Sequence, residues 1–201
     1  MTRHHAQADA GQAFPIYITV VAGLLFLALA YLAVGQAAVN RSGAQTAADA
    51  AALAAAQETR DQLADLWVTD VMDPTKWQDI FDGDGGHDSC WRATELADQN
   101  SADLSGCHWD GAFRYEVGVL TRKSVGDSIV PGTEDKHAKA SATAVIEPLC
   151  TFKLPGDDAG DHTLPKLDCK DDREWVLNPD DLTDLPGPGD LFDVHLATND
   201  E

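Results

Sequence analysis

Basic residues are scarce in this sequence. Lys and Arg total 14 against 34 Asp and Glu, which gives a formal net charge of −20. So acidic a chain is repelled by nucleic acid and by anionic lipid surfaces, which argues against both as partners. A solvated surface that keeps an exported domain soluble explains the same composition.

The short motifs that accompany catalysis are also missing. There is no GxSxG, no phosphate-binding glycine loop and no HExxH. The histidines and paired carboxylates lie in polar, loop-like segments, where solvation explains them. Asp82 and Asp84 alternate as at the start of a calcium loop, but Ala93 stands where a bidentate glutamate is needed. We therefore predict a protein that is not an enzyme, with no cofactor and no metal site.

Charge is absent between Asp9 and Arg41. The most apolar part, residues 16–34, would span about 29 Å as a helix, which matches the roughly 30 Å hydrocarbon core of a membrane. We predict a transmembrane helix over 13–40 after a cytoplasmic segment 1–12. Two alternatives are a secretory signal cut near the Ala28-Leu-Ala30 sequence and a pilin-type leader cut just before the helix.

Small residues dominate the next segment, 41–72, which we predict to extend the same helix. Gly43, Ala47, Ala51 and Ala55 repeat every four residues. Small side chains at this spacing allow another backbone to approach closely. This helix-packing face would press against the chain's own domain, against other subunits in a homo- or hetero-oligomer, or against both.

No cysteine precedes residue 90. The four that follow, Cys90, Cys107, Cys150 and Cys169, predict two disulfides in an exported domain. Three pairings are possible. We favour the sequential pairs, Cys90–Cys107 and Cys150–Cys169, because each closes a short polar loop. A zinc site is the rival, but no CxxC or HxxxH pair supports it.

Two stretches alternate between apolar and polar residues. Phe113–Val119 and Ala138–Glu147 predict an antiparallel pair of strands. Alanines line one face of the second strand, which suits close contact with the alanine-rich helix. We predict an α+β extracytoplasmic domain over 73–190, with a loop over 99–110, a short strand near 174–177 and a loose tail over 191–201.

The combination resembles the TadE/TadG-like proteins of bacterial Tad (Flp) pilus systems. The resemblance lies in Gly11-Gln-Ala-Phe-Pro15 before the apolar run, in the Ala44–Ala56 segment and, more loosely, in the alanine-rich strand over 138–146. It implies a pilin-like fold, with a long N-terminal helix on a small disulfide-braced antiparallel sheet. It also implies a single-pass protein of the cell membrane, with its N-terminus cytoplasmic and its domain outside.

The resemblance further implies a structural role, as a minor pilin or a TadG-like membrane-anchored factor that acts with other pilus or secretion components. Gly11 would be the processing site. Type IV prepilins carry a glutamate five residues after the cut glycine, whereas this sequence has Ile16. That difference argues against efficient cleavage and against a major polymerising subunit. The alternative function is an acidic, membrane-tethered module that binds divalent cations or cell-wall ligands.

Overall fold

The structure is a computed structural model. It describes residues 13–111, 113–124, 135–154, 156 and 163–198. The elements and contacts reported below concern these residues.

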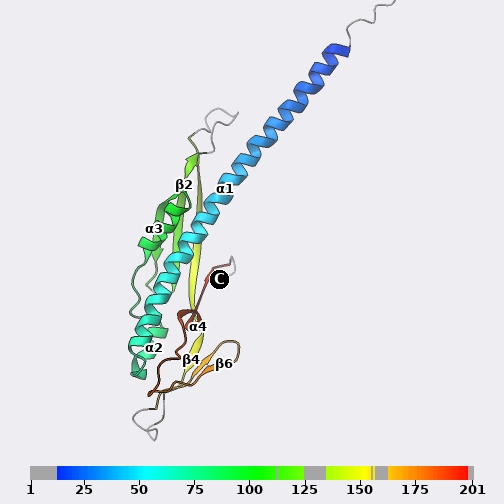
Figure 1. The fold of residues 1–201 in the computed structure, drawn as a ribbon. Coiled ribbons are helices and arrows are strands. Elements are labelled where there is room, and N and C mark those ends of the chain that lie inside the picture. The colour runs from blue at the N-terminus through cyan, green and yellow to red at the C-terminus, as the bar shows by residue number, and fades with distance from the viewer. Residues whose placement is uncertain (1–12, 112, 125–134, 155, 157–162, 199–201) are drawn as a thin grey trace, which may run out of the picture.

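One helix runs through most of the length of the molecule. Helix α1 (Ala13–Thr69) has 57 residues, and its N-terminal half projects away from the domain that the rest of the chain forms (Figure 1). Pro15 lies in its first turn, where the missing N–H leaves no intrahelical bond unmade. The predicted membrane segment and its alanine-rich extension are therefore one continuous helix.

The main sheet is antiparallel and lies against the C-terminal half of α1. In the described part of the chain it has four strands in the order β1 (Ala102–Trp109), β2 (Arg114–Ser124), β3 (His137–Pro148) and β7 (Phe192–Leu196). Val117 of β2 stands opposite Ala142 of β3. Helix α1 contacts β2, β3 and β7, and α3 (Cys90–Gln99) packs beside it and against β1.

Smaller elements lie at the end of the domain that is remote from the projecting helix (Figure 1). A 3-10 turn, η1 (Pro74–Lys76), leads into α2 (Trp77–Phe81), and α4 (Pro188–Leu191) precedes β7. A second antiparallel sheet contains β4 (Cys150–Phe152), β5 (Leu167–Cys169) and β6 (Arg173–Trp175). The strand predicted near 174–177 corresponds in part to β6, which ends at Trp175.

The core changes character along α1. Near the projecting half, alanines of the helix lie against Ala142 and Ala144 of β3, all nearly inaccessible to solvent. Farther along, aromatic rings replace them: the centroids of Trp67 and Trp77 are 5.3 Å apart, and Trp77 meets Phe152 of β4 at 5.2 Å. Large aromatic side chains bury more area per residue than alanine, so each residue of the core contributes more hydrophobic stabilisation at this remote end than along the alanine contact.

Two sequence-based predictions about loops were wrong. The stretch predicted as loop over 99–110 contains β1, whose register with β2 shifts between Leu104 and Gly106. The stretch predicted as a loose tail contains β7, and Leu191 and Phe192 are fully buried. Both are edge strands with mixed composition, and pairing with a neighbouring strand gives them the order that their own sequences do not indicate.

The predicted fold class is confirmed. A long N-terminal helix packs on antiparallel sheets in an α+β arrangement with two disulfides, Cys90–Cys107 and Cys150–Cys169. These are the two sequential pairs that the cysteine spacing favours.

Candidate functional site

The small-residue face of α1 is the first candidate. Ala47, Ala51 and Ala55 are fully buried under the chain's own sheet. Gly43 is exposed, and a Cβ placed on it would meet nothing within 4 Å, so it lies outside the contact between α1 and the chain's own sheet. The reason is geometric: each four-residue step advances roughly 40° around a helix of 3.6 residues per turn, so the row drifts off the contact.

Ala44, next to Gly43, is the residue that the domain covers at this point. It is fully buried and lies seven residues before Ala51, a spacing that returns to nearly the same side of a helix. The described domain thus covers the alanine face internally. A neighbouring subunit would reach the same alanines only if the sheet moved away from α1.

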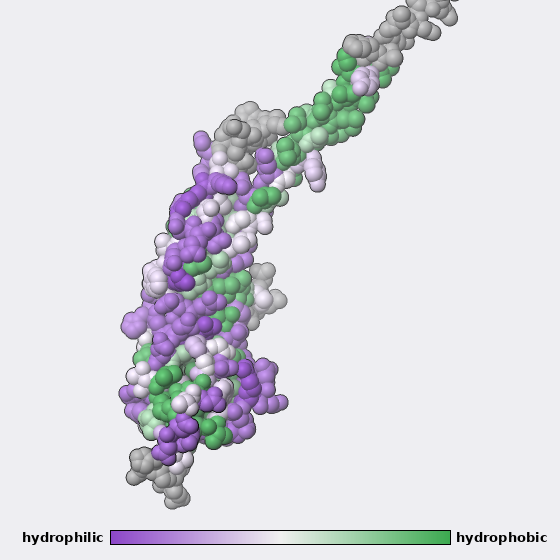
Figure 2. Space-filling model, in the orientation of Figure 1, coloured by the Kyte–Doolittle hydropathy of each residue, from purple (hydrophilic) through white to green (hydrophobic). Residues whose placement is uncertain are grey.

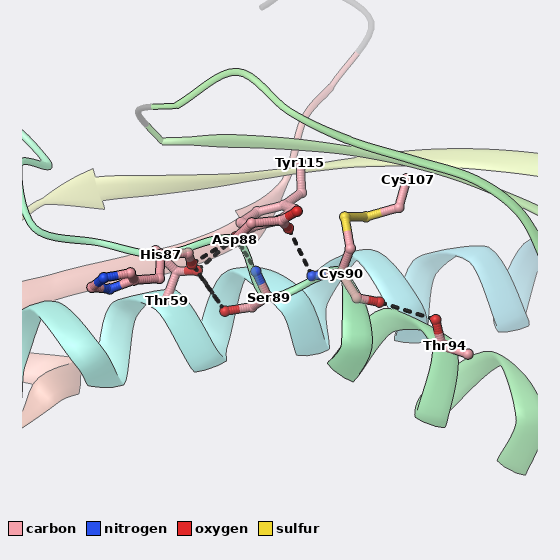
Figure 3. The surroundings of a disulfide bond; sticks show 8 residues. All are labelled: Thr59, His87, Asp88, Ser89, Cys90, Thr94, Cys107 and Tyr115. Carbon is pink, nitrogen blue, oxygen red and sulfur yellow. Dashed lines mark hydrogen bonds between the residues drawn. A yellow bond between two sulfur atoms is a disulfide. The ribbon is translucent and has the colours of Figure 1, made fainter.

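A buried cluster of hydroxyl groups lies at the C-terminal end of this alanine face. The Tyr115 hydroxyl lies 2.7 Å from Thr59 Oγ1 and accepts the backbone N–H of Ser89 at 2.9 Å (Figure 3). Thr59 Oγ1 in turn donates to the backbone oxygen of His87 at 3.1 Å and lies 3.0 Å from Ser89 Oγ. Helix α1, the loop before α3 and strand β2 are therefore joined at one point.

The hydroxyl cluster was not predicted, although one signal was present. Thr59 continues the four-residue repeat of Ala47, Ala51 and Ala55, and it is the polar member of an otherwise apolar row. A hydroxyl that is fully buried needs hydrogen-bond partners. The sequence does not reveal that Ser89 and Tyr115 supply them.

The Cys90–Cys107 disulfide lies directly beside this cluster (Figure 3). Cys90 is the first residue of α3, and its backbone N–H donates to Asp88 Oδ1 at 2.8 Å. The bond ties the start of α3 to β1. Together, the hydroxyl cluster and the disulfide fix the layer formed by α1, α3 and the sheet, a structural arrangement rather than a reactive one.

Metal-ligating side chains approach one another at two places in the described chain. Asp88 lies near Cys90 and Cys107, but both sulfurs are already joined in the disulfide. Glu147, Asp193 and His195 are close together across β3 and β7. There Glu147 pairs with Lys170 at 2.7 Å, and Asp193 Oδ2 lies 3.0 Å from His195 Nδ1. Each carboxylate therefore already has a protein partner.

The projecting half of α1 is the second candidate surface. Its large apolar side chains are exposed from Ile16 to Val39, and this part of α1 is long and apolar enough to cross a membrane (Figure 2). Exposed apolar area of this extent is unusual on a soluble monomer and marks a surface that lipid or protein covers. The predicted processing residue Gly11 lies outside the described residues.

Comparison with known protein families identifies the N-terminal region of the chain. Residues 11–58 match the model of the family described as "Putative Flp pilus-assembly TadE/G-like". No curated protein and no solved structure matches the chain. The matched segment covers the projecting half of α1 and its alanine face, and it ends one residue before Thr59. The resemblance predicted from the sequence is therefore confirmed for this region, because residues 11–58 match the TadE/G-like family model.

Proposed function

We propose that this protein is a structural, non-enzymatic component of a Tad-type pilus or secretion apparatus, either a minor pilin or a membrane-anchored assembly factor. The observation that carries the proposal is the position of the family match on α1. One half of that helix presents bare apolar side chains, and the other half forms the inner layer of a folded domain. A part built in this way holds a domain at a membrane.

The apolar half of α1 would cross the membrane once, with the N-terminus in the cytoplasm and the domain outside. The two disulfides support this orientation, because disulfides persist in oxidising compartments. A reporter fused after Glu201 tests it. We expect activity from a reporter that works only outside the cytoplasm, and activity from a cytoplasm-only reporter would contradict the orientation.

The role in the apparatus is tested by deletion and by co-purification. A strain without this protein should lose surface pili or secretion, and a plasmid copy should restore them. Full-length protein tagged at its C-terminus should co-purify with other components of the apparatus from detergent extracts. Normal pili in the deletion strain would contradict the proposal.

A matched pair of variants separates the span from the domain. Leu25→Arg with Leu29→Arg places two charges in the exposed apolar half, and each charge is expensive near the centre of a bilayer. We expect this variant to leave the membrane fraction. Arg substitutions at the exposed Gln57 and Asp65, in the domain half of α1, serve as the control and should leave membrane insertion unchanged.

A further inference from the structure

The acidic charge of the chain is not spread evenly over the structure. Four basic residues, Arg41, Lys123, Lys136 and Lys139, lie around the end of the domain from which the apolar half of α1 projects; we call them the basic collar. Their places follow from two contacts at this end. Asn40 Nδ2 donates to the backbone oxygen of Ser124 at 2.9 Å, and Ser124 of β2 stands opposite His137 of β3.

The side chains of the collar residues are exposed. They differ from the neighbouring Arg122, which is paired with two carboxylates. Arg122 is held by Asp98 and by Asp103, whose Oδ1 lies 2.8 Å from its Nε, and these carboxylates raise the pKa of its guanidinium. Among the described residues, no ion pair within 4.0 Å engages any collar side chain. Among the described residues, Asp135 is the acidic residue that is adjacent in sequence to a collar residue, Lys136. The collar thus presents cations at one end of an otherwise acidic domain.

A groove connects the collar to the apolar helix. Leu32, Gly35 and Val39 of α1 form its apolar side, and Lys123 and Ser124 at the end of β2 form its rim. Figure 2 shows the polar surface of the domain giving way to the apolar helix at this junction. An apolar floor beside a cation matches the junction between the acyl chains and the phosphate of a lipid.

The length of α1 places the collar at the right depth. Residues 16–34 match the hydrocarbon core, and the next seven residues, to Arg41, rise about 10 Å along a helix. The polar headgroup layers add roughly 5–8 Å on each side of the hydrocarbon. A tilted helix therefore brings Arg41, and with it the end of β2 that Asn40 contacts, level with the lipid phosphates.

We propose that the basic collar binds the phosphate headgroups of anionic lipid and so holds the domain against the membrane surface. The proposal rests on the membrane span proposed above. It also restricts the sequence-based argument against anionic lipid as a partner. The acidic surface taken as a whole repels anionic lipid, but the end of the domain that faces the membrane carries positive charge.

Lipid retention tests this directly. Full-length protein is purified in mild detergent containing equal amounts of phosphatidylglycerol and phosphatidylcholine, and the bound lipids are extracted and quantified. In dilute salt we expect enrichment of phosphatidylglycerol of about twofold or more, since each cation near the surface favours anionic lipid. The enrichment should fall towards one at about 0.5 M NaCl, because salt screens exposed charges.

Variants assign the preference to the collar. Replacing Arg41, Lys123, Lys136 and Lys139 together by Gln should bring the lipid ratio to one, whereas replacing the three lysines by Arg should preserve it. Asp135→Asn should increase the enrichment. Lys153→Gln, beside β4 at the opposite end of the domain, is the control and should have no effect. Melting of the disulfide-bonded protein, followed by circular dichroism, checks that the Gln variant is folded.

Each contrary result has a distinct meaning. Lipid retained without preference, or a preference that survives the Gln substitutions, overturns the collar but leaves the membrane span intact. An equal loss in Lys153→Gln assigns the effect to total charge and also overturns it. If the lipid ratio is one and an acidic protein co-purifies with the unmodified chain but not with the Gln variant, the collar binds a protein and the lipid proposal is overturned. A chain that retains no lipid and needs no detergent overturns the span and the collar together.

Discussion

At the scale of single residues, the hydroxyl cluster is the most specific feature of the domain. Thr59, Ser89 and Tyr115 come from three separate segments and satisfy one another inside a core rich in alanine. Because alanine supplies little buried area per residue, polar contacts of this kind contribute more to a unique packing arrangement here than they would in a core rich in large side chains.

Tyr115→Phe should destabilise the domain by about 1–3 kcal/mol, because it removes the acceptor of the buried Ser89 N–H and one of the hydrogen-bond partners of Thr59. Thermal or denaturant unfolding of the full-length protein in detergent measures the effect. Tyr31→Phe is the matched control, since Tyr31 is 83% exposed on the projecting helix. Equal stability of the two variants would show that the cluster is not stabilising.

At the scale of elements, α1 performs two tasks with one continuous helix. Its first half is apolar on its exposed surface, and its second half presents a face of alanines to β3 and a face to α3. Small side chains let the helix lie close to the sheet, and the aromatic cluster around Trp67 and Trp77 supplies bulk where the layers end.

Ala51→Leu and Ala55→Leu should each cost about 1–3 kcal/mol of unfolding free energy, because the added methyl groups overpack a closed contact. Gly43→Ala should instead leave stability unchanged or raise it by about 1 kcal/mol, since the position is open and alanine favours helix. Melting of the full-length variants measures both effects. Normal melting with lost co-purification in the leucine variants would identify a subunit interface instead.

The Cys90–Cys107 bond joins α3 to β1 across 17 positions of sequence. Replacing both cysteines by alanine should cost about 3 kcal/mol, by the loop-entropy model for a loop of this size. Unfolding of the double variant in denaturant measures the loss. The control is the unmodified protein with both disulfides intact, and equal midpoints would show that the surrounding contacts alone hold α3 in place.

At the scale of the whole molecule, the two ends are chemically different. The apolar half of α1 leaves the domain at one end, beside exposed basic residues. The small second sheet lies at the other end (Figure 1), and its Phe152 belongs to the aromatic cluster. This difference between the two ends suits a protein that is anchored in a membrane by one end, with the second sheet directed away from the membrane.

We expect the mature protein to keep a largely uncut N-terminus, because Ile16 stands where prepilins carry the glutamate that assists cleavage after the glycine. The intact mass of protein extracted from membranes measures this. Ile16→Glu is the informative variant and should increase cutting after Gly11. A mature chain that begins at Tyr31 would instead identify a secretory signal and contradict the membrane span.

Much of the helix and strand framework could be predicted from the sequence because its causes are local. The uncharged run and the alanine repeat indicate one long helix, and strict alternation indicates β2 and β3. The number and spacing of the cysteines restrict the disulfides to a few pairings. The match to the family model also lies within one continuous stretch, residues 11–58.

Only the tertiary structure decided the features whose causes are non-local. Strands β1 and β7 have mixed sequences, and hydrogen bonds to β2 and β3 give them their conformation. The exposure of Gly43 depends on how the helix rotates relative to the sheet. Thr59 and Tyr115 are 56 positions apart, and the cations of the collar come from α1, from β2, from β3 and from the residue before β3. Side chains so far apart in sequence become neighbours only when backbone pairing fixes the register between elements, which no local pattern specifies.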